Sequence, residues 1–297
     1  MRCLVFGGTG MLGQAVIAEA RSRGWAALGL SRAQADIMDP GCLPGWADAF
    51  RPELVVNCAA FTKVDACETD PSQAFAVNGE AVANVAAVAA RAGAALVHVS
   101  TDYVFEGTAN EPYREDAPTR PCSVYGRSKL AGEAHALACD RGLVVRTSWL
   151  FGPGGPNFVA TMVGLIEAGR VPLRVVRDQE GCPTYAPFLA RALLDLAQGG
   201  VTGIVHYRNR EPVSWYAFAA EIARLWSGAV EVVPVTTAEF PRPAPRPAYS
   251  VLDVTRFERS AGRSVEPWEW GLVEMLGHLR CLRRLRQEQE LRKGRRG

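Results

Sequence analysis

Tyr125 and Lys129 are the two side chains whose types and spacing best suit acid–base chemistry. They stand four residues apart in a segment that is predicted to be helical, so both project from one helical face. A phenol has a pKa near 10, and a neighbouring ammonium group favours its ionised form, which makes it usable in proton transfer at neutral pH. Thr101 stands 24 residues before Tyr125 and offers a hydroxyl that can bind the same substrate oxygen.

A second group of residues is suited to binding a dinucleotide. The segment Gly7-Gly8-Thr9-Gly10-Met11-Leu12-Gly13 follows an apolar run and opens a predicted helix. Glycines at this spacing allow a tight turn, close approach of a pyrophosphate and close helix–strand packing, while the helix N-terminus supplies amide donors. The segment therefore predicts these cofactor contacts: Gly7, Gly10, Met11, Leu12 and Gly13.

The choice of cofactor is read at the end of the second apolar run, where the sequence is Gly29-Leu30-Ser31-Arg32. A carboxylate there would accept hydrogen bonds from a ribose diol, whereas Arg32 suits a 2′-phosphate and Ser31 adds a hydroxyl. This favours NADP(H), with NAD(H) possible, because Arg32 could equally be a solvated surface charge. Asp36 and Ile37 are expected to lie beside the adenine.

The elements that must position these residues alternate along the first half of the chain. Near-continuous apolar runs predict strands over 3–6, 27–30, 54–57, 96–100 and 143–147, and helical patterns lie between them over 11–23, 42–50, 71–92 and 123–141. This alternation indicates an α/β protein with a Rossmann-type, doubly wound parallel sheet over residues 1–150. Thr101 then ends the fourth strand, at the edge where such sheets bind ligands.

After residue 150 the elements become shorter and proline and glycine more frequent. We expect a smaller substrate-binding lobe over 151–280, with later segments returning to the sheet. Residues 281–297 carry seven Arg or Lys against two Glu. We expect this basic tail to be disordered, the alternative being that Leu282 and Leu285 dock on the body or on a partner subunit.

Composition excludes several other classes of protein. The chain has 297 residues, 48% of them hydrophobic and 22% charged, as in ordinary globular proteins. No apolar stretch is long enough to span a bilayer, and the basic tail lacks the interleaved aromatics of a nucleic-acid platform. The eight cysteines form no Cys-x-x-Cys pair, which argues against zinc and disulfides. These features predict a cytoplasmic protein that binds neither membrane nor nucleic acid.

The order of these motifs resembles the dTDP-4-dehydrorhamnose reductase family of extended short-chain dehydrogenases over nearly the whole chain. The segments that carry the resemblance are 7–13, 57–62 with Val64-Asp65, 100–105, 125–129, 146–149, Asn157-Phe158, 178–184 and 246–250. Sugar-nucleotide dehydratases instead place an Asp-Glu pair after the threonine. Here Asp102 is followed by Tyr103, which favours simple ketone reduction.

The resemblance implies a catalytic triad of Thr101, Tyr125 and Lys129 that reduces the C4 ketone of a nucleotide-linked 4-keto-6-deoxy sugar. It places Ala59, Ala60 and Phe61 along the cofactor, together with Tyr125 and Lys129. It also implies these substrate contacts: Thr101, Asp102, Trp149, Gln179 and Thr184. Trp149 could equally be an aromatic residue of the lobe junction, and Gln179 and Thr184 could belong to a structural turn.

The family resemblance further implies Mg²⁺ and a homodimer. Enterobacterial-type members carry a glutamate for the metal just after the glycine loop, but position 15 here is alanine, so no metal ligand is predicted. Two other functions stay open. One is a non-catalytic NADP-binding regulatory subunit like that of methionine adenosyltransferase, and the other is a 4-ketoreductase of a different deoxysugar pathway.

Overall fold

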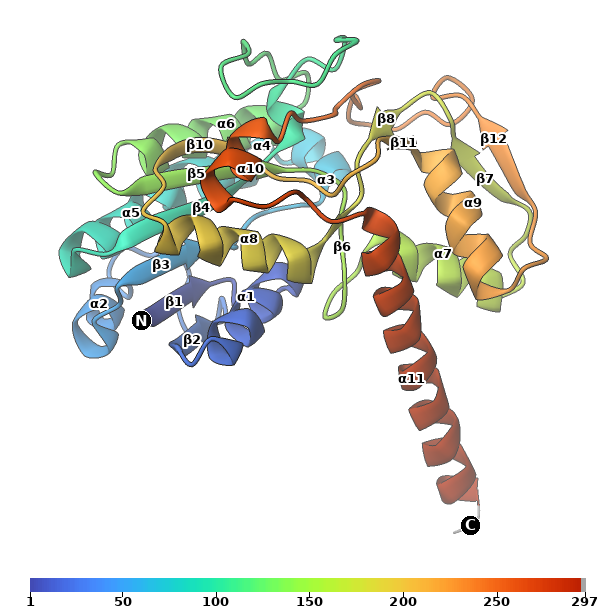
Figure 1. The fold of residues 1–297 in the computed structure, drawn as a ribbon, viewed down its shortest axis with the longest axis horizontal. Helices are drawn as coiled ribbons and strands as arrows, with labels where there is room; N and C mark the ends of the chain where they lie inside the picture. Colours follow the sequence, from blue (N-terminus) through green and yellow to red (C-terminus); the bar gives the residue numbers. More distant parts are fainter. Residues whose placement is uncertain (295–297) are drawn as a thin grey trace.

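Six parallel strands form the central sheet (Figure 1). The structure is a computed structural model that describes residues 1–294. The strand order is β10-β5-β4-β3-β1-β2. The strands are β1 Arg2–Phe6, β2 Ala26–Leu30, β3 Leu54–Asn57, β4 Ala95–Thr101, β5 Gly142–Thr147 and β10 Gly203–His206. The predicted Rossmann-type parallel sheet is confirmed, and the ends of all five predicted strands lie within one residue of those expected.

Helices cover both faces of this sheet, as the doubly wound architecture requires. Residues alternate along each strand, so that Val5, Val56 and Val145 pack on one side and Leu4, Val55 and Val144 on the other. The first side is covered by α1 Met11–Ser22 and α8 Ala186–Gln198. The second side is covered by α2 Pro44–Phe50, α5 Ala81–Ala92 and α6 Val124–Leu137. Because both faces are buried, the strands read as continuous apolar runs in the sequence.

The helical segment expected over 71–92 consists of three consecutive pieces. These are α4 Pro71–Phe75, the π-helical turn η1 Ala76–Glu80 and α5. Asp70 caps α4, because its Oδ1 accepts a hydrogen bond of 3.0 Å from the backbone N–H of Gln73. A short helix that the sequence did not predict, α3 Val64–Thr69, precedes them. Asn78 lies within this wider π-helical turn, just before α5.

A smaller lobe lies beside the sheet and is built from the second half of the chain (Figure 1). Its principal elements are α7 Phe158–Glu167, α9 Trp215–Trp226 and the parallel pair β7 Leu173–Val176 and β12 Val232–Val235. Short pairs connect it to the sheet: β6 Leu150–Phe151 with β9 Thr184–Tyr185, and β8 Glu180–Gly181 with β11 Val213–Ser214. A 3₁₀ turn, η2 Asp102–Val104, follows β4, and α10 Thr255–Ala261 packs against α8 and β10.

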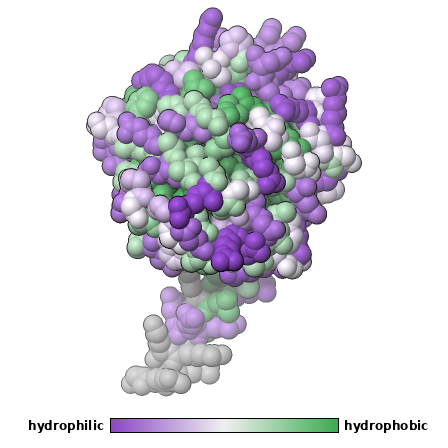
Figure 2. Space-filling model, turned by 90° about the vertical axis from the view of Figure 1, so that its left-hand side faces the viewer, coloured by the Kyte–Doolittle hydropathy of each residue, from purple (hydrophilic) through white to green (hydrophobic). Residues whose placement is uncertain are grey.

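The last described element is α11 Trp268–Gly294, which projects away from the body (Figures 1 and 2). We expected residues 281–297 to form a disordered tail; residues 281–294 continue this helix, and 295–297 lie outside the described residues. The segment is rich in Leu, Arg, Gln and Glu, all good helix formers, and its basic residues suit the C-terminal end of a helix dipole. The helix is docked on the lobe, because Arg280 donates to the carbonyl oxygen of Leu225 at 2.6 Å and Arg283 pairs with Glu167 at 3.3 Å. Neither α11 nor any other described helix has the length and apolar character needed to cross a membrane.

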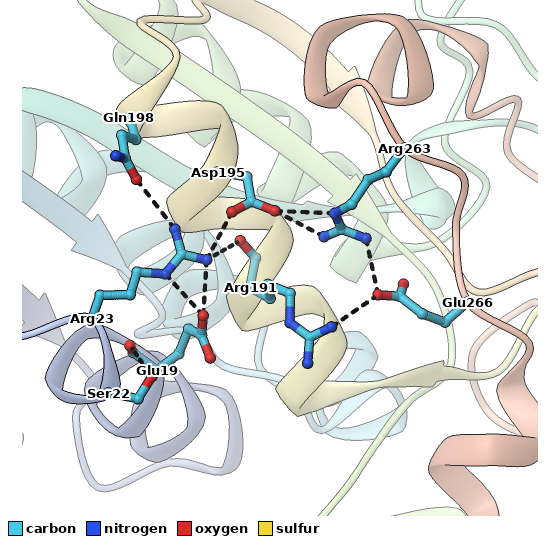
Figure 3. A network of polar contacts seen from close by, with 8 residues as sticks. All are labelled: Glu19, Ser22, Arg23, Arg191, Asp195, Gln198, Arg263 and Glu266. Atoms are coloured by element: carbon cyan, nitrogen blue, oxygen red, sulfur yellow. Dashed lines mark hydrogen bonds and ion pairs between the residues drawn. The ribbon is translucent and has the colours of Figure 1, made fainter.

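An ion-pair network fastens the base of α11 to the sheet domain (Figure 3). Asp195 of α8 accepts from Arg23 of α1 at 2.7 Å and from Arg263 of the segment before α11 at 2.9 Å. Arg263 also pairs with Glu266 at 2.9 Å, and Glu266 accepts a hydrogen bond of 2.7 Å from the buried Tyr207 hydroxyl. One carboxylate, that of Asp195, therefore joins three segments that are far apart in the sequence.

Replacing Asp195 by alanine should lower the free energy of unfolding by about 1–3 kcal/mol, because two partly buried guanidinium groups lose a shared acceptor. The matched control is Asp48→Ala, which removes a pair with Arg91 whose side chains are 57% and 54% exposed. Water screens that exposed pair, so its loss should have little effect on stability. Urea unfolding of both variants measures the difference. Equal losses would contradict the role of Asp195 as a junction.

Candidate active site

The glycine loop between β1 and α1 packs directly against β2 and against the segment that follows β3. Gly7 has a φ of +73°, and a Cβ atom there would lie 2.7 Å from the backbone nitrogen of Ala59. A Cβ atom on Gly8 would lie 2.6 Å from Cα of Gly29. Gly13 has no room for a Cβ either, because the carbonyl oxygen of Gly7 fills the space. The loop is therefore a side-chain-free cradle at the N-terminus of α1, as a pyrophosphate requires. Gly8 has the same constraint, although the sequence analysis gave it no role.

The residues expected at the adenosine end follow β2. Arg32 is 73% exposed and pairs with Asp36 through an Nε–Oδ2 contact of 3.0 Å. The Ser31 hydroxyl donates to Oε1 of Gln34 at 2.8 Å, and the Ile37 side chain is buried. The Arg32 guanidinium is thus available at the surface to an anionic group, with Asp36 as its present partner.

Two asparagines hold the segment after β3, which includes Ala59, Ala60 and Phe61. Oδ1 of Asn57 accepts from the Ala59 N–H at 3.1 Å, and Oδ1 of Asn78 accepts from the Phe61 N–H at 2.8 Å. The Asn78 amide also donates to the Phe61 carbonyl at 3.1 Å and to the Ser128 hydroxyl at 3.0 Å. Asn78 therefore ties this segment to α6. Asn78 was not among the candidate residues, although it is a polar side chain within the helix predicted over 71–92.

The start of α6 fixes Tyr125. Ser123 caps the helix by accepting from the Gly126 N–H at 3.1 Å, and Glu68 of α3 accepts from the Val124 N–H at 2.7 Å. Burial raises the pKa of the Tyr125 phenol, the Asp102 charge raises it further, and the Thr101 hydroxyl opposes the shift. Lys129 is not among the groups that shift this pKa. Tyr125 therefore keeps its proton at neutral pH and is suited to donate it.

Lys129 lies one turn further along α6, and its side chain is only 2% exposed. Its Nζ donates to the carbonyl oxygen of Val99 at 2.7 Å and lies 3.4 Å from Nε2 of His98. Burial lowers the pKa of Lys129 to about 8, although the charge of Glu133 opposes this shift. His98 was not among the candidate residues. It stands in the fourth predicted strand as one polar side chain within a run of buried apolar ones.

Asp102 follows Thr101 and is 2% exposed. Its Oδ1 accepts from the Thr101 hydroxyl at 2.9 Å, while Oδ2 has no hydrogen-bond partner within the described part of the chain. Burial raises the pKa of this carboxyl to about 6, and the nearby Ser250 and Thr101 hydroxyls oppose this shift. A buried oxygen without a partner is costly, so Oδ2 is well suited to accept a hydroxyl from a bound ligand.

A buried ion pair lies beneath these residues. Arg146 of β5 binds Glu133 of α6 through two contacts of 2.9 and 2.6 Å, and the Ser100 hydroxyl donates to the same carboxylate at 2.5 Å. Both charged side chains are 3% exposed. Sequence reasoning missed Glu133, which stands four residues after Lys129, a spacing that places it on the same helical face.

The remaining predicted substrate residues lie toward the lobe. The Trp149 ring stacks on Trp215 at 3.6 Å with planes 7° apart, and Trp149 has a φ of +45°. Thr184 is fully buried, and its N–H donates to the Trp149 carbonyl at 3.2 Å, which extends the short β6–β9 pairing. Gln179 donates to the Thr237 hydroxyl at 3.0 Å. The structure thus joins Trp149 and Thr184 at the junction and binds Gln179 to the segment after β12.

No group of three or more His, Cys, Asp or Glu side chains gathers to hold a metal ion anywhere in residues 1–294. Position 15, where the resemblance implies a metal-binding glutamate in some members, is an alanine packed against the core.

Glu133→Gln should destabilise the protein by about 3–5 kcal/mol, because it leaves the Arg146 guanidinium buried without a compensating charge. Asp116→Asn is the matched control, since it neutralises a carboxylate whose pair with Arg114 is exposed on both sides. That change should have little effect, because water screens the pair. Chemical unfolding measures both. A loss for Glu133→Gln as small as that of the control would show that the buried pair does not support the site.

Comparison with known proteins gives a consistent result. The family model described as "RmlD substrate binding domain" matches residues 1–281. A dTDP-4-dehydrorhamnose reductase from Streptomyces griseus is 42% identical over 281 residues, which cover 92% of each chain. A probable dTDP-4,6-dihydroxy-2-methyloxan-3-one 4-ketoreductase from Streptomyces antibioticus is 40% identical over 278 residues, 92% of this chain and 94% of that one. The crystal structure of dTDP-4-dehydrorhamnose reductase from Bacillus anthracis in complex with NADP has a TM-score of 0.89 at 35% identity, and covers 93% of this chain and 99% of that one.

Proposed function

The chain belongs to the dTDP-4-dehydrorhamnose reductase family, and we propose that it uses NADPH to reduce the C4 ketone of dTDP-4-dehydrorhamnose to give dTDP-rhamnose. The observation that carries this proposal is the position of Thr101, Tyr125 and Lys129 beside a glycine cradle at one edge of the sheet. The names of the relatives support the substrate, and the NADP complex of the Bacillus anthracis reductase supports the cofactor.

The residues of the site divide the work of a ketone reduction. NADPH supplies the hydride when it is bound. Tyr125, whose raised pKa keeps the phenol protonated, donates its proton to the oxygen of the former ketone. Thr101 lies beside Tyr125 and can donate to the same oxygen once its hydroxyl turns away from Asp102. Oδ2 of Asp102 has no hydrogen-bond partner among the described residues, and it accepts a hydrogen bond from a sugar hydroxyl. This contact orients the sugar ring.

Lys129 and the glycine loop hold the cofactor in this proposal. The ammonium form of Lys129 binds the ribose hydroxyls, and the amides at the start of α1 bind the pyrophosphate. Ser31 and Arg32 receive the 2′-phosphate, which distinguishes NADPH from NADH. Trp149, Gln179 and Thr184 shape the sugar end of the crevice from the lobe side.

A second candidate is reduction of a different 4-keto sugar nucleotide. It is favoured by the Streptomyces antibioticus relative, whose identity to this chain is 40% against 42% for the Streptomyces griseus reductase. The catalytic residues would act in the same way on either substrate, so only the lobe contacts would differ.

One assay tests the proposed function and its alternatives. The protein is incubated with NADPH and a panel of 4-keto-6-deoxy sugar nucleotides, and the C4 configuration of each product is determined. We expect the highest kcat/KM with dTDP-4-dehydrorhamnose. A higher value for another 4-keto sugar would support the second candidate, whereas NADPH binding without any turnover would support a regulatory subunit.

Tyr125→Phe should lower kcat by about 10²–10⁴, because it removes only the proton donor, while the Kd for NADPH should change little. Tyr216→Phe on α9 is the matched control and should leave kcat unchanged. Steady-state kinetics and fluorescence titration of NADPH measure the two quantities. A kcat for Tyr125→Phe within a few-fold of the unmodified enzyme would refute the assignment of Tyr125.

Arg32→Ala should weaken NADPH binding about ten- to a hundred-fold, since it removes a charge-assisted contact with the 2′-phosphate. NADH binding should barely change. Arg120→Ala is a suitable control, because Arg120 is 72% exposed and also faces a carboxylate, that of Glu106. Equal losses for NADPH and NADH would show that Arg32 has a structural role instead.

A further inference from the structure

Asn57 and His98 connect Lys129 to the backbone of the segment that follows β3. The two residues are direct neighbours on β3 and β4, and both are buried. Ala59 N–H donates to Asn57 Oδ1 at 3.1 Å, and Asn57 Nδ2 lies 3.1 Å from His98 Nδ1. His98 Nε2 in turn lies 3.4 Å from Lys129 Nζ. Polar atoms are therefore in contact all the way from Ala59 to Lys129.

The direction of each hydrogen bond follows from the first donor. A backbone N–H can only donate, so the oxygen of the Asn57 amide must face Ala59. The amide nitrogen then faces His98, and because it too can only donate, Nδ1 of His98 must be the acceptor. Burial lowers the pKa of His98 well below its ordinary value, so the ring is neutral. A neutral ring that accepts at Nδ1 carries its proton on Nε2.

This arrangement has a consequence for Lys129. The N–H at Nε2 of His98 points at Nζ, where a neutral amine can accept it but an ammonium group cannot. For the ammonium to donate to Nε2, the ring proton must move to Nδ1 and the Asn57 amide must turn over. The amide nitrogen would then face the Ala59 N–H, and that buried donor would lose its acceptor. Each charge state of Lys129 thus corresponds to one tautomer of His98.

We propose that Asn57 and His98 form a tautomeric relay that couples the charge of Lys129 to the backbone amide of Ala59. The neutral amine is compatible with the intact chain of hydrogen bonds, and the ammonium form requires its reversal. The consequence of the relay rests on the proposed function, in which Lys129 and Ala59 both contact the cofactor. The relay would therefore link cofactor binding to the protonation of Lys129.

The other groups around Lys129 have opposing effects on its charge, so the relay can determine the charge. Glu133 on the same helix favours the ammonium, and burial opposes it. The Glu133 carboxylate is held by Arg146, and the Val99 carbonyl accepts from Nζ in the observed structure. The resulting pKa of Lys129, about 8, lies close to neutral pH. A modest change in the hydrogen bonds of His98 would therefore change the charge of Lys129 within the working range.

The tautomer of His98 can be observed directly by long-range ¹H–¹⁵N NMR of histidine-labelled protein without any ligand. The chain has four histidines, and the buried His206 is an internal control. Nδ1 of His206 faces the Tyr113 carbonyl at 3.0 Å, so that ring must carry its proton on Nδ1. His135 and His278 are exposed, unlike the two buried rings. Above the pKa of Lys129 we expect the proton of His98 on Nε2, opposite to His206. A proton on Nδ1 of both rings at that pH would overturn the proposal.

The coupling to Lys129 is tested by Asn57→Asp, followed by ¹³C NMR titration of the lysine side chains, of which the chain has three. Both carboxylate oxygens can accept, one from Ala59 and one from a proton on Nδ1 of His98. Nε2 is then free to accept from the ammonium, and we expect the pKa of Lys129 to rise by about one unit or more. NADPH binding, which should weaken as pH rises through the pKa of Lys129, should persist to a correspondingly higher pH.

The double variant Asn57→Asp with His98→Phe separates the relay from simple attraction between charges. If His98 transmits the effect, the rise in the pKa of Lys129 should be mostly lost relative to His98→Phe alone. The same rise in both backgrounds would overturn the relay. These NMR measurements need no substrate, so their outcome is independent of the turnover assay. If turnover is absent but the tautomer and the shift are found, the proposed function fails and the relay stands.

Discussion

The Lys129 side chain is buried without a carboxylate to pair with it, and the rest of the site depends on this constraint. The helix that carries it packs closely on neighbouring turns, and glycines allow this. A Cβ atom on Gly126 would meet the carbonyl of Tyr103, and one on Gly132 would meet that of Asn78. The ammonium group is thereby taken out of water, and among the described residues a backbone carbonyl and an imidazole nitrogen face it. Its charge is costly under these conditions, and burial therefore lowers the pKa of Lys129.

The nearest carboxylate does not relieve this cost, because it is already committed. Glu133 forms a two-pronged pair with Arg146 and also accepts from Ser100. Such a buried pair contributes little to stability by itself, but it fixes β4, β5 and α6 relative to one another. Thr101 and Tyr125 extend from two of these three elements. The Glu133–Arg146 ion pair, which takes no part in the reaction, therefore helps set the distance between Tyr125 and Thr101.

The sheet could be predicted because its strands are covered on both faces and read as continuous apolar runs. Tyr125, Lys129 and the glycine loop could be found because their spacing lies within one helix or one turn. His98 and Asn78 could not, since their importance comes from partners 31 and 50 residues away along the chain. The basic composition of residues 281–297 favours a disordered tail, whereas its helix formers and the contacts of Arg280 and Arg283 with the lobe favour a helix. β10 contains only four residues and became recognisable as the sixth strand through its pairing with β5.

Burial raises the pKa of the acidic groups of this site and lowers that of Lys129, and this favours reduction. It raises the pKa of the Tyr125 phenol, so the proton is present when the ketone oxygen gains charge. It lowers the pKa of Lys129 to about 8 and raises that of Asp102 to about 6, so both of these groups change charge close to neutral pH. A bound ligand that excludes the remaining water would strengthen each effect, except where it supplies a hydrogen bond to the charged form.

Oδ2 of Asp102 is buried and unpaired within residues 1–294, and it can receive such a bond. A sugar hydroxyl placed there would keep Asp102 ionised while Tyr125 stays protonated. The same contact would therefore orient the substrate and preserve the difference in charge between the two groups.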